Sequence, residues 1–204
     1  VQLRGERAEA ARALADKGVG APVEASRFGR QVRAAINGLV GDELRLLGDP
    51  QAITMTLRHL GEDVPATSWH VLKAWPKATS HLVVFLHGLC ESDESWELGR
   101  RQRPTYAERS DEDTTGTPGR VRRNPGLHVS ENGQHLDELL EQLVGAWPVA
   151  VTRITLVGHS MGGLVARAAT NRATVAGHQW KHLVSDVVCL GTPHAGAALE
   201  KAAH

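Results

Sequence analysis

The stretch from Arg153 to Ala169, RITLVGHSMGGLVARAA, constrains the fold more than any other part of the sequence. A short apolar run ending at Gly158 is typical of a strand that is buried on both faces of a parallel sheet. Apolar residues at helical spacing follow from Leu164 onward. The chain must therefore turn sharply between a strand and a helix, with glycine leaving room for neighbouring backbone. This pattern predicts an α/β domain with Ser160 at the carboxyl end of a strand.

The turn itself, Gly158-His159-Ser160-Met161-Gly162, has the pattern G-x-S-x-G. Between a strand and a helix, this pattern presents a serine hydroxyl as a nucleophile. The alternative is an ordinary strand-to-helix turn in which Ser160 only caps the helix. The phosphate-binding patterns G-x-G-x-x-G and G-x-x-x-x-G-K-[ST] do not occur at this turn. We therefore expect Ser160 to be a catalytic nucleophile.

A serine nucleophile needs a histidine base, a carboxylate that orients the base, and hydrogen-bond donors for the oxyanion. Two backbone N–H groups are expected to be these donors. One belongs to Met161, directly after Ser160, and the other to Leu89, which follows His87 and Gly88. We expect His87, and likewise His159, to orient these segments by hydrogen bonding rather than to act as the base.

Composition argues against several classes of partner. The 204 residues include 23 basic and 23 acidic side chains, which does not favour nucleic acid. No apolar run reaches the ~20 residues of a transmembrane segment, and the first residues lack the apolar core of a signal peptide. Cys90 and Cys189 are expected to be buried free thiols, so a cytoplasmic location is predicted. No cluster with metal-ligand spacing occurs, so neither metal nor cofactor is expected.

The N-terminal part, residues 1–66, is expected to be a helical extension. Its helices are predicted over residues 1–17 and 26–40, with a short helical piece at 44–47. Residues 67–204 are expected to form the α/β core. There, Trp69 to Trp75 is predicted as an edge strand ending before Pro76, and His81 to Leu86 as a central strand.

The second half of the core alternates between polar and periodic segments. Residues 100–123 are strongly charged and predict a polar connection with a short helix at 105–109. Residues 130–147 have apolar side chains at i, i+3, i+4 and i+7 and predict an amphipathic helix. Residues 185–190 predict another buried strand, followed by the loop 191–196.

Three motifs in this order resemble those of α/β-hydrolase-fold lipases and esterases: FLHGL at 85–89, LVGHSMGGLVAR at 156–167 and LGTPHAG at 190–196. The resemblance extends to the branch containing GPI inositol-deacylases and bacterial triacylglycerol lipases. It implies an eight-stranded, mostly parallel sheet with helices on both faces. It also implies a Ser-His-Asp triad and small-molecule or lipid esters as substrates.

The sequence departs from that family in two places. The family's acid and histidine follow the serine after later strands, whereas this sequence ends at His204, 44 residues after Ser160. His194 is a candidate substitute base, although the family's histidine at this position is generally not the base, and Asp186 is expected to be a strand-start residue. The family also commonly has a strand where residues 110–125 show almost no strand pattern.

These observations predict a serine hydrolase that cleaves carboxylic esters through an acyl-enzyme on Ser160, with triad partners outside this sequence. One alternative is acyl transfer to an acceptor other than water. Another is a non-catalytic or truncated hydrolase-fold domain that acts as a binding module. A sheet that ends early exposes an apolar edge, so self-association is also expected.

Overall fold

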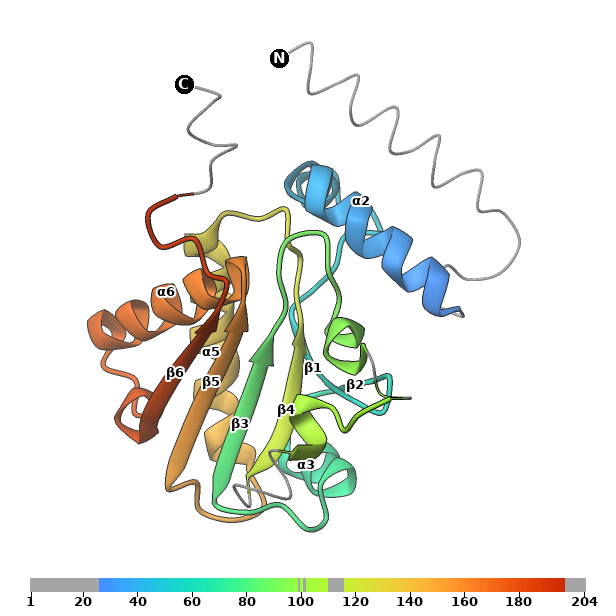
Figure 1. Cartoon of the computed structure of the whole chain (residues 1–204). Coiled ribbons are helices and arrows are strands. Elements are labelled where there is room, and N and C mark those ends of the chain that lie inside the picture. Colours follow the sequence, from blue (N-terminus) through green and yellow to red (C-terminus); the bar gives the residue numbers. More distant parts are fainter. Residues whose placement is uncertain (1–25, 99, 101, 110–115, 197–204) are drawn as a thin grey trace.

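The computed structural model describes residues 26–196, apart from 99, 101 and 110–115. They contain a six-stranded sheet of order β2-β1-β4-β3-β5-β6 (Figure 1). Four neighbouring strands are parallel: β3 (His81–Leu86), β4 (Thr117–Arg122), β5 (Arg153–His159) and β6 (Val184–Leu190). β1 (Thr56–His59) pairs antiparallel with both β4 and β2 (Glu62–Val64). The predicted mostly parallel α/β sheet is confirmed.

β3 lies at the centre, and all six of its residues are buried. Alternate side chains from Leu82 to Leu86 enter the larger core, which contains buried residues of α5 (Val129–Ala146) and α6 (Met161–Ala176). Val83 and Phe85 face the other way, toward Trp96 in the 3-10 helix η2 (Asp93–Glu97). Burial on both faces explains why this strand reads as a continuous apolar run.

α5 confirms the helix predicted from apolar spacing. Leu136, Leu140 and Leu143 recur at that spacing and are fully buried. At Gly133 the helix touches α6, since a Cβ there would lie 2.6 Å from the Cβ of Ala168. α5 and α6 therefore form one closely packed layer behind the sheet, as Figure 1 shows.

The two helical pieces expected around residues 26–47 are one helix, α2 (Arg27–Leu46). The expected break appears as a kink at Val40, where φ is −141° and ψ is 21°. α2 lies near the end of the sheet where β3 and β5 terminate (Figure 1). Gly38 packs there against the turn after β3, since a Cβ at this position would lie 2.5 Å from Cys90 Sγ.

The predicted edge strand at 69–75 is wrong, because this segment is the helix α3 (Ser68–Ala74). Val71 and Trp75, one helical turn apart, are both buried, so the apolar spacing fits a helix better than a strand. The sheet edge is instead the β1–β2 hairpin. Its turn residues Leu60 and Gly61 have φ of 49° and 86°, as a tight two-residue hairpin requires.

This hairpin lies inside the region expected to be a helical extension, so the expectation of an all-helical region is corrected at residues 56–64. The expected helix over residues 1–17 lies outside the described residues. The division of the chain into residues 1–66 and 67–204 stays a prediction.

β4 forms within the segment that shows almost no strand pattern. Its sequence TPGRVR contains proline and glycine, but β3 and β1 bind it on both sides. Gly119 allows close packing, since a Cβ there would lie 3.1 Å from Leu57 Cδ1. The neighbouring strands therefore impose a conformation that local propensity does not favour. Residues 106–109 form a helical turn, in agreement with the short helix predicted there.

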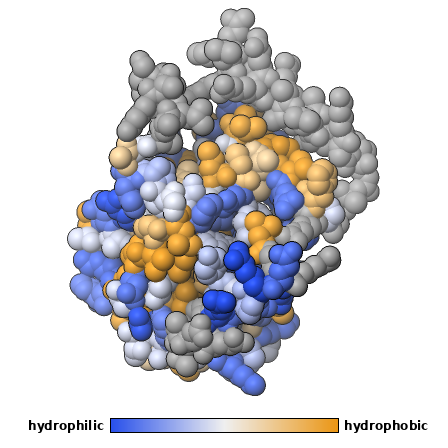
Figure 2. All heavy atoms as spheres, viewed as in Figure 1, coloured by the Kyte–Doolittle hydropathy of each residue, from blue (hydrophilic) through white to orange (hydrophobic). Residues whose placement is uncertain are grey.

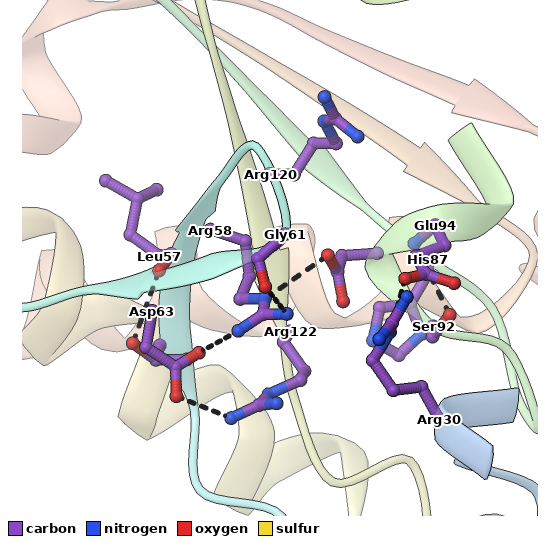
Figure 3. A network of polar contacts seen from close by, with 12 residues as sticks. Arg30, Leu57, Arg58, Gly61, Asp63, His87, Ser92, Glu94, Arg120 and Arg122 are labelled. Carbon is purple, nitrogen blue, oxygen red and sulfur yellow. Dashed lines mark hydrogen bonds and ion pairs between the residues drawn. The ribbon is translucent and has the colours of Figure 1, made fainter. Parts of the chain in front are cut away.

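A polar network joins the hairpin to η2 (Figure 3). The Arg58 side chain is only 7% exposed, and it donates to Asp63 Oδ1 at 2.6 Å and to Asp93 Oδ2 at 3.4 Å. Burial alone would lower the pKa of Arg58, but the hydrogen bonds and charges of these two aspartates outweigh it and raise that pKa. Arg30 of α2 binds the next acidic residue, Glu94, at 2.5 Å. Strand β1 and helix α2 therefore both anchor η2.

Both cysteines are free thiols, as predicted, but their expected burial is wrong for Cys90, which is exposed in the turn after β3. Cys189 is half-buried. Within the described ranges, no helix is both long and apolar enough to cross a membrane. Among the described residues, no three His, Cys, Asp or Glu side chains are grouped so that they could hold a metal ion.

Candidate active site

Ser160 occupies a strained turn between β5 and α6, with φ of 50° and ψ of −121°. Residues other than glycine rarely adopt this backbone conformation, and it persists only where the surrounding structure enforces it. The Ser160 N–H donates to the carbonyl of Leu190 at the end of β6, 2.8 Å away. The Ser160 hydroxyl makes no capping hydrogen bond to α6, so the helix-cap alternative is wrong.

Two glycines make this turn possible, as the sequence predicts. A Cβ at Gly158 would lie 2.4 Å from the backbone nitrogen of Gly163, and a Cβ at Gly162 would lie 2.2 Å from the carbonyl oxygen of Leu86. Both distances are far below van der Waals contact. The first turn of α6 can therefore approach β3 and β5 only with glycine at these positions.

The β3 loop, residues 87–92, lies against this turn. A Cβ at Gly88 would be 3.2 Å from the Cβ of Ser160, so the two segments are in direct contact. The β3 loop and the Ser160 turn therefore meet at one edge of the sheet. Leu89 follows with half of its surface exposed, and Met161 begins α6. The role of their amides as oxyanion donors stays a prediction.

His87 is fully buried at the start of the β3 loop. The backbone N–H of Arg123 can only donate, so His87 Nε2, 3.3 Å away, accepts its hydrogen. Nδ1 then carries the ring proton and donates to the carbonyl of Gly88 at 2.9 Å. Burial and the charge of Arg123 lower the pKa of His87 to about 3. His87 is therefore neutral, and its ring ties the β3 loop to the residue after β4.

Arg123 is a residue that sequence reasoning missed. Its side chain is fully buried, and Nη2 donates to the carbonyl of His87 at 2.7 Å. Burial lowers the pKa of Arg123 to about 10, against the opposing effect of the charge of Glu91. The sequence places Arg123 in a run of charged residues that suggests solvent. In the structure Arg123 continues the alternate burial of the strand before it, at Thr117, Gly119 and Val121, but no sequence pattern marks this.

Glu91 is a second residue of the site that sequence reasoning missed. Its Oε2 accepts the N–H of Gly88 at 2.6 Å and lies 3.0 Å from His159 Nδ1. The carboxylate therefore joins the β3 loop to the last residue of β5. The expected role of His159 in orienting these segments stays a prediction.

His194 and Asp186 both have arginine partners in the structure. His194 is exposed, and its Nδ1 accepts a hydrogen bond from Arg167 Nη1 at 2.7 Å. Among the described residues, no histidine makes a hydrogen bond to the Ser160 hydroxyl. Asp186 pairs with Arg153 at the beginning of β5, and hydrogen bonds from Arg153 and Ser185 lower its pKa. His204 lies outside the described residues.

A cavity of about 400 Å³ is lined by two neighbours of Ser160, although not by Ser160 itself. His159 and Leu190, which line it, are the residue before Ser160 and the residue whose carbonyl binds the Ser160 amide. Trp96 forms part of its wall, and its ring centroid lies 6.1 Å from that of Tyr106 and 6.5 Å from that of His159. The remaining lining residues are Glu91, Ser95, Leu98, Arg103, Pro104, Thr105 and Arg109. The cavity thus combines an aromatic wall with a charged rim.

Residues 77–203, more than half of the chain, match the PGAP1-like alpha/beta domain. The chain belongs to this family. The matched part of the chain contains β3 to β6, the Ser160 turn and the β3 loop. Family membership and the mostly parallel sheet together identify an α/β-hydrolase fold of the lipase and esterase kind, as the resemblance predicts.

Two curated relatives are triacylglycerol lipases, one from Pseudarthrobacter phenanthrenivorans and one from Burkholderia plantarii. Each is 30% identical to this PGAP1-like protein over 124 residues, which cover 59% of this chain and 35% and 31% of the two relatives. The chain therefore spans about a third of the length of these relatives.

Two solved structures that resemble the chain are crystal structures of Bacillus licheniformis lipase BlEst2. The mature form aligns with a TM-score of 0.45 and 24% identity, over 60% of this chain and 44% of that one. The propeptide form aligns with a TM-score of 0.46 and 20% identity, over 74% and 28%.

Proposed function

We propose that this PGAP1-like domain belongs to a serine hydrolase that cleaves carboxylic esters through an acyl-enzyme on Ser160. The observation that carries the proposal is the strained backbone of Ser160 between β5 and α6. A serine held at φ of 50° with its hydroxyl not used as a helix cap has no evident structural purpose. The same geometry is what a nucleophile at the end of a strand requires.

In the proposed reaction, Ser160 Oγ attacks the ester carbonyl carbon and its proton passes to a base. The carbonyl oxygen becomes an oxyanion, and we expect the amides of Leu89 and Met161 to donate hydrogen bonds to it. The amino end of α6, a helix of 16 residues, adds a favourable dipole. Collapse of the intermediate releases the alcohol, which takes the proton from the base, and water then cleaves the acyl-enzyme.

The cavity lined by His159 and Leu190 suggests which part of the substrate it receives. A volume of about 400 Å³ and the aromatic wall at Trp96 and Tyr106 suit the apolar chain of an ester. We therefore propose a small-molecule or lipid ester as the substrate. Acyl transfer to an alcohol or thiol instead of water would use the same site.

A second candidate is a non-catalytic domain that binds a ligand or partner through the hydrolase fold. It is favoured by one observation: no hydrogen bond joins a histidine to the Ser160 hydroxyl within the described ranges. His87 is unsuited to replace the missing base, because it is enclosed and neutral with both ring nitrogens engaged.

Labelling with a fluorophosphonate probe separates the two candidates. We expect the folded protein to form one covalent adduct, mapped to Ser160 by mass spectrometry. Ser160→Ala should abolish it while leaving the circular dichroism spectrum unchanged. Absence of labelling in a folded sample, or labelling that survives in Ser160→Ala, would contradict the hydrolase proposal for this chain and favour the binding module.

A further inference from the structure

The two expected oxyanion donors lie on different segments of the chain. Leu89 belongs to the β3 loop and Met161 to the first turn of α6, 72 residues apart in sequence. Two amides can bind one oxygen only if their separation is held within a few tenths of an ångström. Some contact must therefore fix the β3 loop relative to the Ser160 turn.

Glu91 makes such a contact on both sides. One of its oxygens, Oε2, accepts the N–H of Gly88 at 2.6 Å, and Gly88 directly precedes Leu89. His159, which directly precedes Ser160, places Nδ1 at 3.0 Å from both carboxylate oxygens. The bond from Gly88 is short, as expected for an amide that donates to a charged acceptor.

The bond to Glu91 also decides which amide is available. Because the Gly88 N–H is engaged by the carboxylate, it cannot turn toward a substrate oxygen. Glycine at position 88 suits this arrangement, since a Cβ there would lie 3.0 Å from Glu91 Oε2 and 3.2 Å from Ser160 Cβ. The next amide along the loop, that of Leu89, has no such bond to Glu91, and we expect it to be the donor on this side.

We infer that Glu91 is a positioning residue: its carboxylate binds the Gly88 amide and His159 and so fixes the distance between the Leu89 and Met161 donors. This inference rests on the proposed function, because it assigns Glu91 to the oxyanion geometry of that reaction. It does not make Glu91 the base or the triad acid, since within the described residues neither Glu91 nor its partner His159 makes a hydrogen bond to the Ser160 hydroxyl.

The test compares Glu91→Ala, Glu91→Gln and Glu97→Ala in the full chain. Glu97 is a matched control, because its side chain has the same exposed fraction as that of Glu91, 29%, and lies in the adjoining η2. Glu97 pairs with Arg120 and Arg100 instead of the β3 loop. The Gln variant keeps an oxygen that can accept the Gly88 N–H.

Fluorophosphonate labelling gives the first measurement. We expect Glu91→Ala to lower kinact by about 10- to 100-fold with little change in KI, since misplacing one oxyanion donor costs on this order. Glu91→Gln should stay within about threefold of the parent because a neutral hydrogen bond replaces a charged one. Glu97→Ala should leave kinact unchanged. Equal kinact in the parent and Glu91→Ala would overturn the inference.

The amide proton resonance of Gly88 gives a second measurement that does not need activity. A short bond to a carboxylate should shift this proton downfield and slow its exchange with solvent. Glu91→Ala should reverse both effects, and Glu97→Ala neither. If the parent protein is not labelled, the proposed function fails for this chain, and the Gly88 resonance alone then tests the role of Glu91. An unchanged Gly88 resonance in Glu91→Ala would overturn the inference.

Discussion

The imidazole of His87 sits at the start of the β3 loop without a positive charge. Its pKa is lowered to about 3 by burial and by the neighbouring Arg123, whereas a histidine in the unfolded chain titrates near ~6.5. Between these values the unfolded chain binds a proton at this position and the folded protein does not. The charge state of one side chain therefore links the stability of this site to pH.

We predict that the free energy of unfolding falls as the pH is lowered from about 6.5 toward 3. The sign follows from proton binding, because stability rises with pH wherever the unfolded state holds more protons. His87 alone contributes up to about 1.4 kcal/mol per pH unit in this window. Urea titrations at several pH values measure the slope. His87→Gln, which does not titrate, should show a shallower slope. An equal slope in both proteins would contradict this account.

At this scale the sequence predicted the parts whose roles are local. Ser160 and its two glycines form a contiguous motif, and the structure gives them the expected turn. Glu91 and Arg123 could not be found in this way, because each acquires its role from a segment far away in the chain. Arg123 in particular reads as a solvated charge and is instead fully buried.

The helix α5 contains two glycines in opposite surroundings. A Cβ at Gly133 would lie 2.6 Å from the Cβ of Ala168 in α6, whereas a Cβ at Gly145 would meet nothing within 4 Å. Helical propensity favours alanine at both positions by similar amounts. The two sites therefore separate the contribution of helix packing from that of the backbone.

We predict opposite effects of the same substitution in α5. Gly145→Ala should stabilise the protein by about 0.5–1 kcal/mol, because alanine restricts the unfolded chain at no steric cost. Gly133→Ala should destabilise it by about 1–3 kcal/mol, because α5 and α6 would have to separate. Urea denaturation of the two variants measures both. A stabilising Gly133→Ala would show that the α5–α6 contact is adaptable.

Elements were predicted well where periodicity and tertiary packing agree. β3 and α5 have the expected bounds to within about one residue, because the positions of the apolar residues in each segment already indicate its buried surface. α3 was mistaken for a strand because seven residues are too few to separate a period of 2 from a period of 3.6. β4 was missed because its conformation is imposed by the strands on either side.

Two apolar regions appear on the surface in Figure 2, one over α2 and one over β5 and β6. In β6, Val187 and Val188 are 38% and 41% exposed, on opposite faces of the sheet. Within the described residues β6 pairs only with β5, so its other edge is open. An open edge with exposed valines is a surface on which sheets associate.

We predict that the protein self-associates through β6 at micromolar concentration. Val188→Lys should weaken this association by about tenfold or more, since a charge on an edge strand opposes pairing. Val175→Lys is the matched control, because Val175 is a valine with 78% exposure on α6, away from the sheet. Sedimentation velocity over a concentration series measures the effect. A monomeric parent protein, or equal effects of the two substitutions, would contradict the prediction.

The parallel pairing of β3 also has a consequence for how the chain is made. His81 in β3 pairs with Arg153 in β5. One edge of β3 therefore stays unpaired until a segment about 70 residues later in the chain has been synthesised. At a translation rate of roughly 5–20 residues per second, this interval lasts about 4–14 s. Pairings of such large sequence separation also form slowly once both strands exist. Nascent HLVVFL therefore lacks one of its strand partners for this interval, and slower synthesis lengthens the time for which that edge is unpaired.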